Sequence, residues 1–274
     1  MLFNEKLKKL RKEYNLTQEE LAEKLYVSRQ AITKWESGDG TPDIENLKQI
    51  SKLFNTTIDE LVKEEKEVKL EEKNSYVESL EIDHTKHFDI NINEIYELNF
   101  IPTTLEQVKI EILSNEENFK ESFEIKFDNL YNKLDIDIKN KNKIKGTINI
   151  YLPPKYINDI ELNSKIKKLS INDLEIEKLE YDGNLKYLNV KNSKGKIVLN
   201  VTTSDVEVTY DKLDGILEIN TVNSTSRVEI PKETEYKTIL KGIKNQFVDA
   251  KNNEDATNII ELNGINSKLI IIEK

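Results

Sequence analysis

TQEELAEKLYVSRQAITKWESG, residues 17–38, is the stretch that decides the fold of the first part of this chain. Its apolar residues recur every three or four positions in two short runs, which is the spacing of one face of an α-helix. Thr17 with Glu20 forms a capping box before the first run, and Ser28 is a good N-cap for the second. Gly38 lies where a left-handed residue would end the second helix. The stretch therefore predicts two short helices joined by a tight turn, an arrangement suited to reading the major groove of DNA.

Apolar residues at helical spacing continue on both sides of this stretch. Residues 3–14 carry one apolar face, and residues 41–43 (Thr-Pro-Asp) open a fourth helix. Thr57 and Glu60 make a second capping box, which predicts a short fifth helix. Residues 1–63 are therefore expected to form a five-helix bundle, and about 60 residues suffice for a small domain of this kind to fold alone.

The hydrophobic period changes from about 3.6 to 2 beyond a highly charged segment. Residues 64–75 are rich in Lys and Glu, and we expect a solvated linker there. Residues 76–274 alternate apolar and polar side chains between turn residues, which predicts an all-β domain with one buried face. The expected strands cover residues 80–83, 88–92, 108–112, 123–127, 134–138, 147–152, 160–163, 169–173, 174–177, 187–190, 196–201, 206–210, 216–220, 227–230 and 269–272.

Repetition within the β domain favours a particular architecture. Gly183, Gly195 and Gly215 each lie close to an expected strand start. We interpret this spacing as a β-solenoid or an elongated β-sandwich, so that the whole chain is a multidomain α plus all-β protein. A plain β-sandwich or a jelly roll is the competing interpretation.

Charge and composition restrict the class of protein. The net charge is −10, but residues 1–63 hold eleven basic and eleven acidic residues, so the deficit lies entirely in the remainder. An acidic C-terminal part repels DNA and restrains non-specific binding without preventing a directed recognition helix. The chain has no Cys, which excludes disulfides and thiolate sites. It has no apolar run long enough to cross a bilayer and no signal-peptide core, so we expect a soluble, cytoplasmic protein.

Residues Lys6 to Leu61 resemble the lambda-repressor-like (XRE/Cro) helix-turn-helix family of bacterial and phage regulators. The apolar core, the caps and Gln18 fall at the family spacing without a gap. The resemblance implies a five-helix DNA-binding domain with residues 29–37 as the recognition helix. It also implies that Gln18 bonds a backbone phosphate and that Ser28 holds another at the start of the recognition helix, where the helix dipole favours an anion. The side chains implied to face the base edges are Arg29, Gln30, Thr33 and Lys34, the last being equally suited to a phosphate.

The chemistry of these side chains agrees with that assignment. Positions 29, 30, 33 and 34 share one helical face, opposite Ile32 and Trp35. An Arg can donate two hydrogen bonds to guanine and a Gln can pair in two ways with adenine, each pair giving roughly 1–3 kcal/mol of discrimination.

Two further features come from the family pattern. Arg11 and Glu36 occupy positions that the family often joins by an ion pair, so we expect a structural pair there; two solvated charges are the alternative. The turn residue is usually Gly, but here it is Tyr26, which loses about 1–2 kcal/mol in a left-handed conformation. Either the turn differs slightly or the tyrosine ring recovers that energy by packing.

Catalytic and metal sites are not expected. His84 and His87 would point to opposite faces of an alternating strand, which prevents shared ligation of a metal. The acidic residues of the β domain alternate with Ile, Leu and Val, so they mark a solvated sheet face. No hydrolase, P-loop or dinucleotide fingerprint occurs. We therefore expect no enzyme activity, no metal and no cofactor.

The C-terminal part resembles the adhesin-type repetitive β domains of many bacterial proteins, a resemblance that implies a fold but no ligand. The leading interpretation is a sequence-specific transcriptional regulator, more specifically a repressor, that binds a palindromic operator in double-stranded DNA as a homodimer. The β domain would dimerise, sense a small-molecule effector or contact another protein, and no membrane partner is expected. The alternative is a protein-interaction or assembly module whose helical domain docks protein, which the neutral charge of residues 1–63 keeps open.

Overall fold

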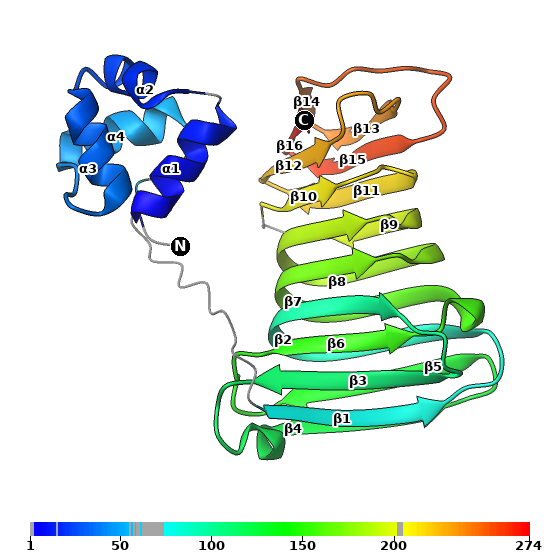
Figure 1. Cartoon of the computed structure of the whole chain (residues 1–274). Helices are drawn as coiled ribbons and strands as arrows, with labels where there is room; N and C mark the ends of the chain where they lie inside the picture. Colours follow the sequence, from blue (N-terminus) through cyan, green and yellow to red (C-terminus); the bar gives the residue numbers. More distant parts are fainter. Residues whose placement is uncertain are drawn as a thin grey trace. The chain divides into compact units, whose positions relative to one another are not determined.

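The computed structural model describes residues 3–14, 16–54, 56, 58, 61, 74–201 and 205–274. The chain divides into two compact units, Met1–Lys69 and Leu70–Lys274, called the first and the second unit below. Helices make up the described part of the first unit and strands dominate the second (Figure 1). Within the described residues, no helix combines the length and the apolar character needed to span a membrane.

The first unit is a helical bundle whose helix ends follow the predicted caps. Its helices are α1 (Phe3–Glu13), α2 (Gln18–Lys24), α3 (Arg29–Ser37) and α4 (Ile44–Leu53). The Thr17 hydroxyl accepts a hydrogen bond from the Glu20 amide while the Glu20 carboxylate accepts one from the Thr17 amide, which confirms the capping box. Gly38 ends α3 in the left-handed conformation, also as predicted. The expected fifth helix falls mostly outside the described residues, with Thr57 and Glu60 among those left out; Ile58 and Leu61 are helical.

Apolar side chains from all of these helices form one core. Those buried are Leu7, Leu21, Ala22, Leu25, Ile32, Trp35, Ile50, Phe54 and Leu61. Each large apolar side chain removed from water contributes roughly 1.5–3 kcal/mol to the stability of the fold. Because Ile32 and Trp35 belong to this core, one face of α3 is fixed against the bundle and the opposite face is turned outward.

The second unit consists of stacked strands joined by short corners. Its strands are β1 (Asn74–Glu81), β2 (Lys86–Pro102), β3 (Gln107–Ser114), β4 (Phe123–Asn129), β5 (Lys133–Asn140), β6 (Thr147–Leu152), β7 (Ile157–Asn172), β8 (Glu175–Lys191), β9 (Lys194–Asn200), β10 (Glu207–Tyr210), β11 (Gly215–Val222), β12 (Thr225–Ile230), β13 (Lys237–Ile243), β14 (Gln246–Val248), β15 (Ile259–Ile265) and β16 (Lys268–Glu273). Two 3₁₀ turns, η1 (Phe119–Ser122) and η2 (Pro154–Tyr156), lie between them.

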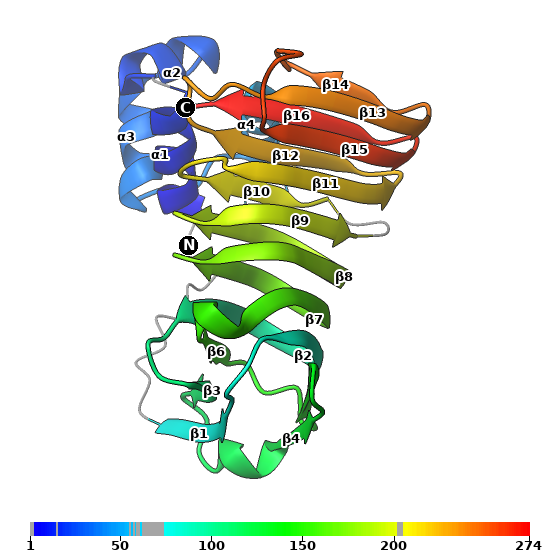
Figure 2. The same cartoon turned by 90° about the vertical axis from the view of Figure 1, so that its right-hand side faces the viewer.

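The strands form two faces that share three long members. One face runs β4-β5-β2-β7-β8-β9-β11-β15-β13 and the other β1-β3-β6-β2-β7-β8-β10-β12-β16-β14. The stack rises from β1 and β4 at one end to β13 and β14 at the other (Figures 1 and 2). Pairing is parallel throughout the described strands except between β1 and β3, β3 and β6, and β4 and β5. A jelly roll is built from antiparallel strands, so these parallel ladders contradict that competing interpretation.

The long strands bend from one face to the other. Residues 175–182 of β8 pair with β9, whereas residues 187–190 pair with β10. Gly183 lies at the bend with φ +145°, and a Cβ there would be 1.8 Å from the Ser164 carbonyl oxygen of the rung below. The prediction that Gly183 marks a strand start is therefore wrong, because β8 runs through it. The expected breaks between 163 and 169 and between 177 and 187 are likewise absent from β7 and β8.

Side chains inside the stack line up in columns because the parallel strands pair in register. Tyr181, Leu199, Ile219 and Leu262 follow one another on β8, β9, β11 and β15, and all four are buried. The last rungs leave the chain order: β15 lies between β11 and β13, and β16 lies between β12 and β14. The two C-terminal strands, β15 and β16, are thus inserted before β13 and β14, and β13 and β14 form the end of the stack.

Candidate DNA-binding surface

Helix α3 presents the predicted base-reading side chains to the outside. Arg29, Gln30, Thr33 and Lys34 are all exposed, whereas Ile32 and Trp35 are buried beneath them. Polar side chains on one face of a helix and apolar anchors on the other are what a helix needs to enter the major groove as a rigid element. The structure thus brings these four side chains together on one accessible face.

Ser28 caps α3, as predicted. Its Oγ accepts a hydrogen bond from the Ala31 amide at 3.2 Å, and the residue is exposed. The first turn of α3 contains no acidic residue. The hydroxyl proton of Ser28 is not used by this cap, so it is available to a phosphate at the positive end of the helix dipole.

Gln18 and Thr33 are engaged within the protein. The Gln18 Nε2 donates to Glu36 Oε2 at 2.9 Å, and the Thr33 hydroxyl lies 3.3 Å from Gln18 Oε1 and 3.0 Å from the Arg29 carbonyl oxygen. A hydroxyl has a single proton, so Thr33 shares it between these two acceptors. To contact DNA, Gln18 or Thr33 would either form an additional hydrogen bond or give up one of the hydrogen bonds in this network. Sequence reasoning missed this coupling of α2 to α3.

Arg11 and Glu36 form an ion pair between α1 and α3. The Arg11 Nε and Nη2 donate to the two carboxylate oxygens of Glu36 at 2.5 and 3.0 Å, and Arg11 Nη1 donates to the Leu16 carbonyl oxygen at 2.8 Å. The Glu36 side chain is only 3% exposed. Burial alone would raise the pKa of Glu36, but hydrogen bonds from Arg11 and Gln18 outweigh burial and lower that pKa. The hydrogen bond to Glu36 raises the pKa of Arg11. The pair is thus charged and holds the end of α3 against α1.

Glu19 touches one of the predicted base readers. Its carboxylate lies 3.7 Å from Arg29 Nε, and both side chains are about two-thirds exposed. A surface pair of this kind contributes about 0–1 kcal/mol and is screened by salt, so it orients Arg29 without locking it. Sequence reasoning missed this contact, because Glu19 and Arg29 lie on different helices and meet only after folding.

Tyr26 adopts the left-handed conformation of the family turn. Its φ is +55°, and its side chain is 92% exposed. The backbone thus takes the positive φ at the position where the family usually has Gly, and the alternative that the ring recovers the energy by packing is wrong because the side chain is exposed. The turn is closed by a hydrogen bond from the Val27 amide to the Ala22 carbonyl oxygen at 3.0 Å.

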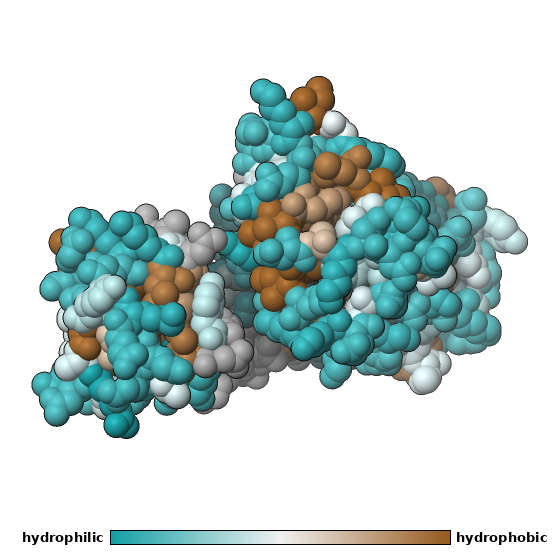
Figure 3. Space-filling model, turned by 90° about the horizontal axis from the view of Figure 1, so that it is seen from above, coloured by the Kyte–Doolittle hydropathy of each residue, from teal (hydrophilic) through white to brown (hydrophobic). Residues whose placement is uncertain are grey.

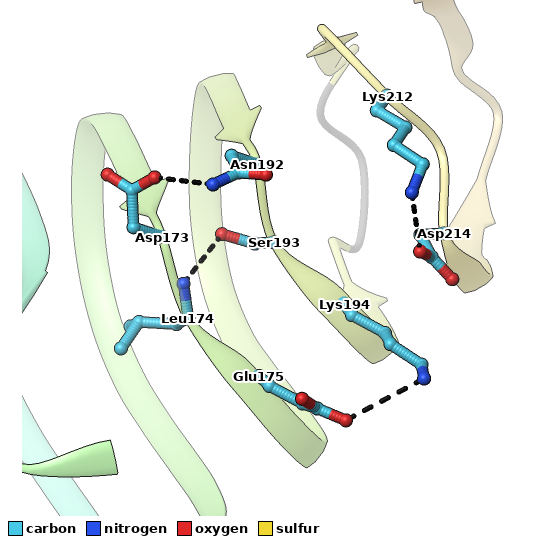
Figure 4. A pocket seen from close by; sticks show the side chains of 8 residues that line it. All are labelled: Asp173, Leu174, Glu175, Asn192, Ser193, Lys194, Lys212 and Asp214. Atoms are coloured by element: carbon cyan, nitrogen blue, oxygen red, sulfur yellow. Dashed lines mark hydrogen bonds and ion pairs between the residues drawn. The ribbon is translucent and has the colours of Figure 1, made fainter.

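A hollow lies on the surface of the second unit, at the corners that precede β8, β9 and β11. It measures about 180 Å³ and is lined by Asp173, Leu174, Glu175, Asn192, Ser193, Lys194, Lys212 and Asp214 (Figure 4). Every charged side chain in this set is already engaged: Asp173 with Asn192, Glu175 with Lys194, and Lys212 with Asp214. The charged side chains that line the hollow are thus paired with their neighbours at the corners of the stack.

The two histidines lie in different settings. His84 precedes β2, contrary to the expected strand position, and its ring stacks on Tyr131 at 4.6 Å between centroids while Nδ1 contacts Asp83. His87 lies on β2 and its Nδ1 is 2.7 Å from Asp159 Oδ2. The two rings therefore contact different carboxylates.

Comparison with known proteins gives the first unit a family. A helix-turn-helix family model matches residues 7–61. The chain is 62% identical over 72 residues to the HTH-type transcriptional activator BcrR of Enterococcus faecalis, a match that covers 26% of this chain and 35% of BcrR. It is 45% identical over 56 residues to the uncharacterized HTH-type transcriptional regulator MJ0272 of Methanocaldococcus jannaschii, covering 20% of this chain and 85% of that protein. The chain thus spans about a third of the length of BcrR and most of the shorter relative.

The second unit has a distant structural neighbour. A crystal structure of a "putative cell adhesion protein" from Clostridium sporogenes aligns with 73% of this chain and 99% of its own, with a TM-score of 0.38 and 17% sequence identity. The sequence match of the first unit is far stronger, and it extends over nearly the full length of a relative. The chain belongs to the family of helix-turn-helix transcriptional regulators.

Proposed function

We propose that the protein is a sequence-specific regulator that places α3 in the major groove of operator DNA. The observation that carries the proposal is the outward face of α3, where Arg29, Gln30, Thr33 and Lys34 are exposed on a helix whose other face is buried. Arg29 and Gln30 read bases, Thr33 and Lys34 contact bases or phosphates, and Ser28 and Gln18 bond the backbone. The Arg11–Glu36 ion pair supports this use of α3 because it braces the helix.

The operator is a palindrome read by a homodimer. A single small helix-turn-helix domain binds weakly, and linking two of them raises the overall affinity by effective concentration. Two-fold half-sites lie about 34–36 Å apart, one turn of DNA. We propose repression by occupation of the operator; BcrR carries the name of an activator, so a promoter fused to a reporter gene must decide the sign.

The second unit supplies dimerisation, effector sensing or contact with another protein. We interpret its parallel stack as a short β-solenoid that follows the charged segment predicted as a linker, with the DNA-binding domain at residues 1–63. Asn74 and Ser75, which the sequence placed at the end of that linker, belong to β1. A stack of this kind offers two long faces and two ends. The edge strands are β1 and β4 at one end and β13 and β14 at the other. An edge strand can pair with another chain without a change in the fold.

The experiment measures binding to an operator selected from genomic fragments, by fluorescence anisotropy. Arg29→Ala with Gln30→Ala should weaken specific binding at least 10-fold, since each bidentate contact is worth roughly 1–3 kcal/mol. Lys12→Ala, which removes an exposed charge at the end of α1, is the matched control and should change affinity little. Equal specific binding by wild type and the double variant would refute the assignment of base readers.

The balanced charge of residues 1–63 favours one second candidate, a domain that docks protein. The salt dependence of binding distinguishes DNA binding from protein docking. Affinity for DNA falls steeply between 50 and 200 mM salt because bound phosphates release counterions, roughly tenfold or more for several phosphate contacts. A flat response, or no binding to genomic fragments, would favour the docking function.

A further inference from the structure

Apolar side chains reach the surface of both units (Figure 3). In the described part of the first unit, the large apolar or aromatic side chains that are exposed belong to Tyr14, Tyr26 and Ile44. Tyr14 is held in place, because its ring packs edge-on against Phe54 and its hydroxyl donates to the Phe54 carbonyl oxygen at 3.2 Å. Tyr26 is 92% exposed, and its side chain forms no hydrogen bond, ion pair or ring contact with the described residues. Its ring is therefore accessible to a partner.

The backbone conformation at Tyr26 suits other residue types better. Its φ of +55° is left-handed, a conformation that a side chain with a Cβ disfavours. Eight other non-glycine residues in the described part of the chain have positive φ: six are Asn or Asp, which tolerate this conformation, and two are Lys. Tyr26 is the only aromatic residue in this set. Residues in unfavourable conformations cluster at functional sites, and this ring gains no packing in return, which indicates that it acts on a partner.

The turn places Tyr26 beside the start of α3. Leu25 before it is buried and Val27 after it packs against the core, so Tyr26 and Ser28 are the residues of the turn that face outward. The amides of Tyr26 and Val27 both donate to carbonyl oxygens of α2, at 3.2 and 3.0 Å, and are therefore not available to a ligand. The hydroxyls of Tyr26 and Ser28 are the groups of this turn that can bond a partner.

The charges around the turn favour an anionic partner. The dipole of α3 is positive at this end, and the first turn of α3 contains no acidic residue. Lys24 and Arg29 are exposed on the two sides of the turn; the exposed acids nearest in the sequence are Glu23 and Glu19, and Glu19 is paired with Arg29. A tyrosine hydroxyl donates a hydrogen bond, and Tyr is among the side chains that bond DNA phosphates. A phosphate of duplex DNA is the partner that fits Tyr26.

We propose that Tyr26 is a further DNA contact, whose hydroxyl donates to a backbone phosphate at the rim of the groove that α3 enters. The inference rests on the proposed function and adds a residue to the same site. The phosphate lies next to the one assigned to Ser28, since both residues face outward from one turn. Phosphates carry no sequence information, so this contact raises the affinity for operator and for unrelated DNA alike, unlike the contacts of Arg29 and Gln30. Tyr26 thus lowers the stability of the first unit and raises its affinity for DNA.

Two substitutions of Tyr26 in the full-length protein test the contact by fluorescence anisotropy. Tyr26→Phe removes only the hydroxyl, so stability should be unchanged while affinity falls roughly 10-fold, the value of one hydrogen bond to a charged group. The loss should be equal for the operator and for a duplex of random sequence. Tyr26→Gly should bind at least as weakly although it is more stable, whereas a merely structural residue would move stability and affinity in the same direction. Tyr131→Phe, which removes the hydroxyl of an 84% exposed tyrosine on the second unit, is the matched control and should bind like the wild type.

Operators that carry a single methylphosphonate identify the acceptor, because each one neutralises one phosphate. At one phosphate in each half-site the wild type should lose more affinity than Tyr26→Phe, which no longer uses that phosphate. Wild-type affinity in Tyr26→Phe, a loss confined to the operator, or the same phosphate profile for both proteins would each overturn the inference. The double variant Arg29→Ala with Gln30→Ala keeps this outcome apart from failure of the proposed function: if it loses specific binding while the Tyr26 variants bind normally, only the Tyr26 contact is refuted.

Discussion

Glu36 in the last turn of α3 accepts hydrogen bonds from Nε and Nη2 of Arg11 near the end of α1, at 2.5 and 3.0 Å. The carboxylate also accepts from Gln18 at the start of α2. One buried anion therefore joins three helices, and it belongs to the helix that carries the base-reading side chains. The orientation of α3 depends on this carboxylate as well as on Ile32 and Trp35.

Replacing Arg11 by Met should lower the free energy of unfolding of the first unit by about 3–5 kcal/mol, because it leaves Glu36 buried and unpaired. The single Trp of the chain, Trp35, lies in α3, so its fluorescence during urea unfolding reports this unit. Lys48→Met, which removes a surface pair with Glu45 at 3.4 Å, is the control and should have little effect. A similar, small effect of both variants would mean that the Arg11–Glu36 pair is not structural.

The same carboxylate should make stability depend on pH. The pKa of Glu36 is lowered in the folded state, so its contribution is present above the unfolded pKa of about 4.3 and is lost as the pH falls through the folded pKa. Glu36→Gln cannot ionise. The free-energy difference between wild type and Glu36→Gln, followed by Trp35 fluorescence, should be constant above about pH 5 and shrink below pH ~4. A difference that grows on acidification would contradict the direction of the shift.

The helices of the first unit could be predicted because their signals are local. Caps such as Thr17 and Asp43 lie within one turn of the helices they start, and both act as caps in the structure. The bracing of Gln18 by Glu36 could not be predicted in the same way, since the two residues lie eighteen positions apart and meet only after folding.

The strands of the second unit were harder to delimit. Alternation of apolar and polar residues continues through a corner, so β7 and β8 each appeared as two short strands. Strands β13, β14 and β15 were missed because Gly242, Gly264 and clustered apolar residues break the alternation. The corners carry a signal of their own in the sequence: an Asn-Ser pair, with Asn at positive φ and Ser buried, recurs at three of them. These pairs are Asn192–Ser193, Asn223–Ser224 and Asn266–Ser267.

Tyr26→Gly should stabilise the first unit by about 1 kcal/mol, because it removes the left-handed strain while the exposed ring has no packing to lose. Tyr26→Asn should give a smaller gain, since Asn tolerates this conformation better than Tyr. Tyr26→Phe, which keeps the strain, serves as the control. Urea unfolding followed by Trp35 fluorescence provides the comparison, and a destabilised Gly variant would show that the ring has a structural role.

Gly183→Ala should unfold or strongly destabilise the second unit and leave the first intact. The added Cβ would lie 1.8 Å from the Ser164 carbonyl oxygen, and φ of +145° is unfavourable for Ala. The loss should reach at least about 3 kcal/mol, the upper range for overpacking of a core. Gly40→Ala, whose nearest neighbour would lie at 3.7 Å, is the control. Far-UV circular dichroism follows the strands and Trp35 follows the helices; an unchanged β signal on heating would contradict the close approach.

Ser28 has two proposed roles that one substitution can separate. Its Oγ caps α3 through the Ala31 amide, and its free proton is available to a phosphate. Ser28→Asp keeps a cap acceptor and favours the helix dipole, so stability should be retained, but its charge repels phosphate and operator affinity should fall at least 10-fold. Ser28→Ala removes the cap and should cost about 1 kcal/mol of stability. Unfolding by urea and anisotropy with the operator measure the two roles on the same samples. If Ser28→Asp binds operator as tightly as wild type, no phosphate lies at the start of α3, and the orientation proposed for the recognition helix is wrong.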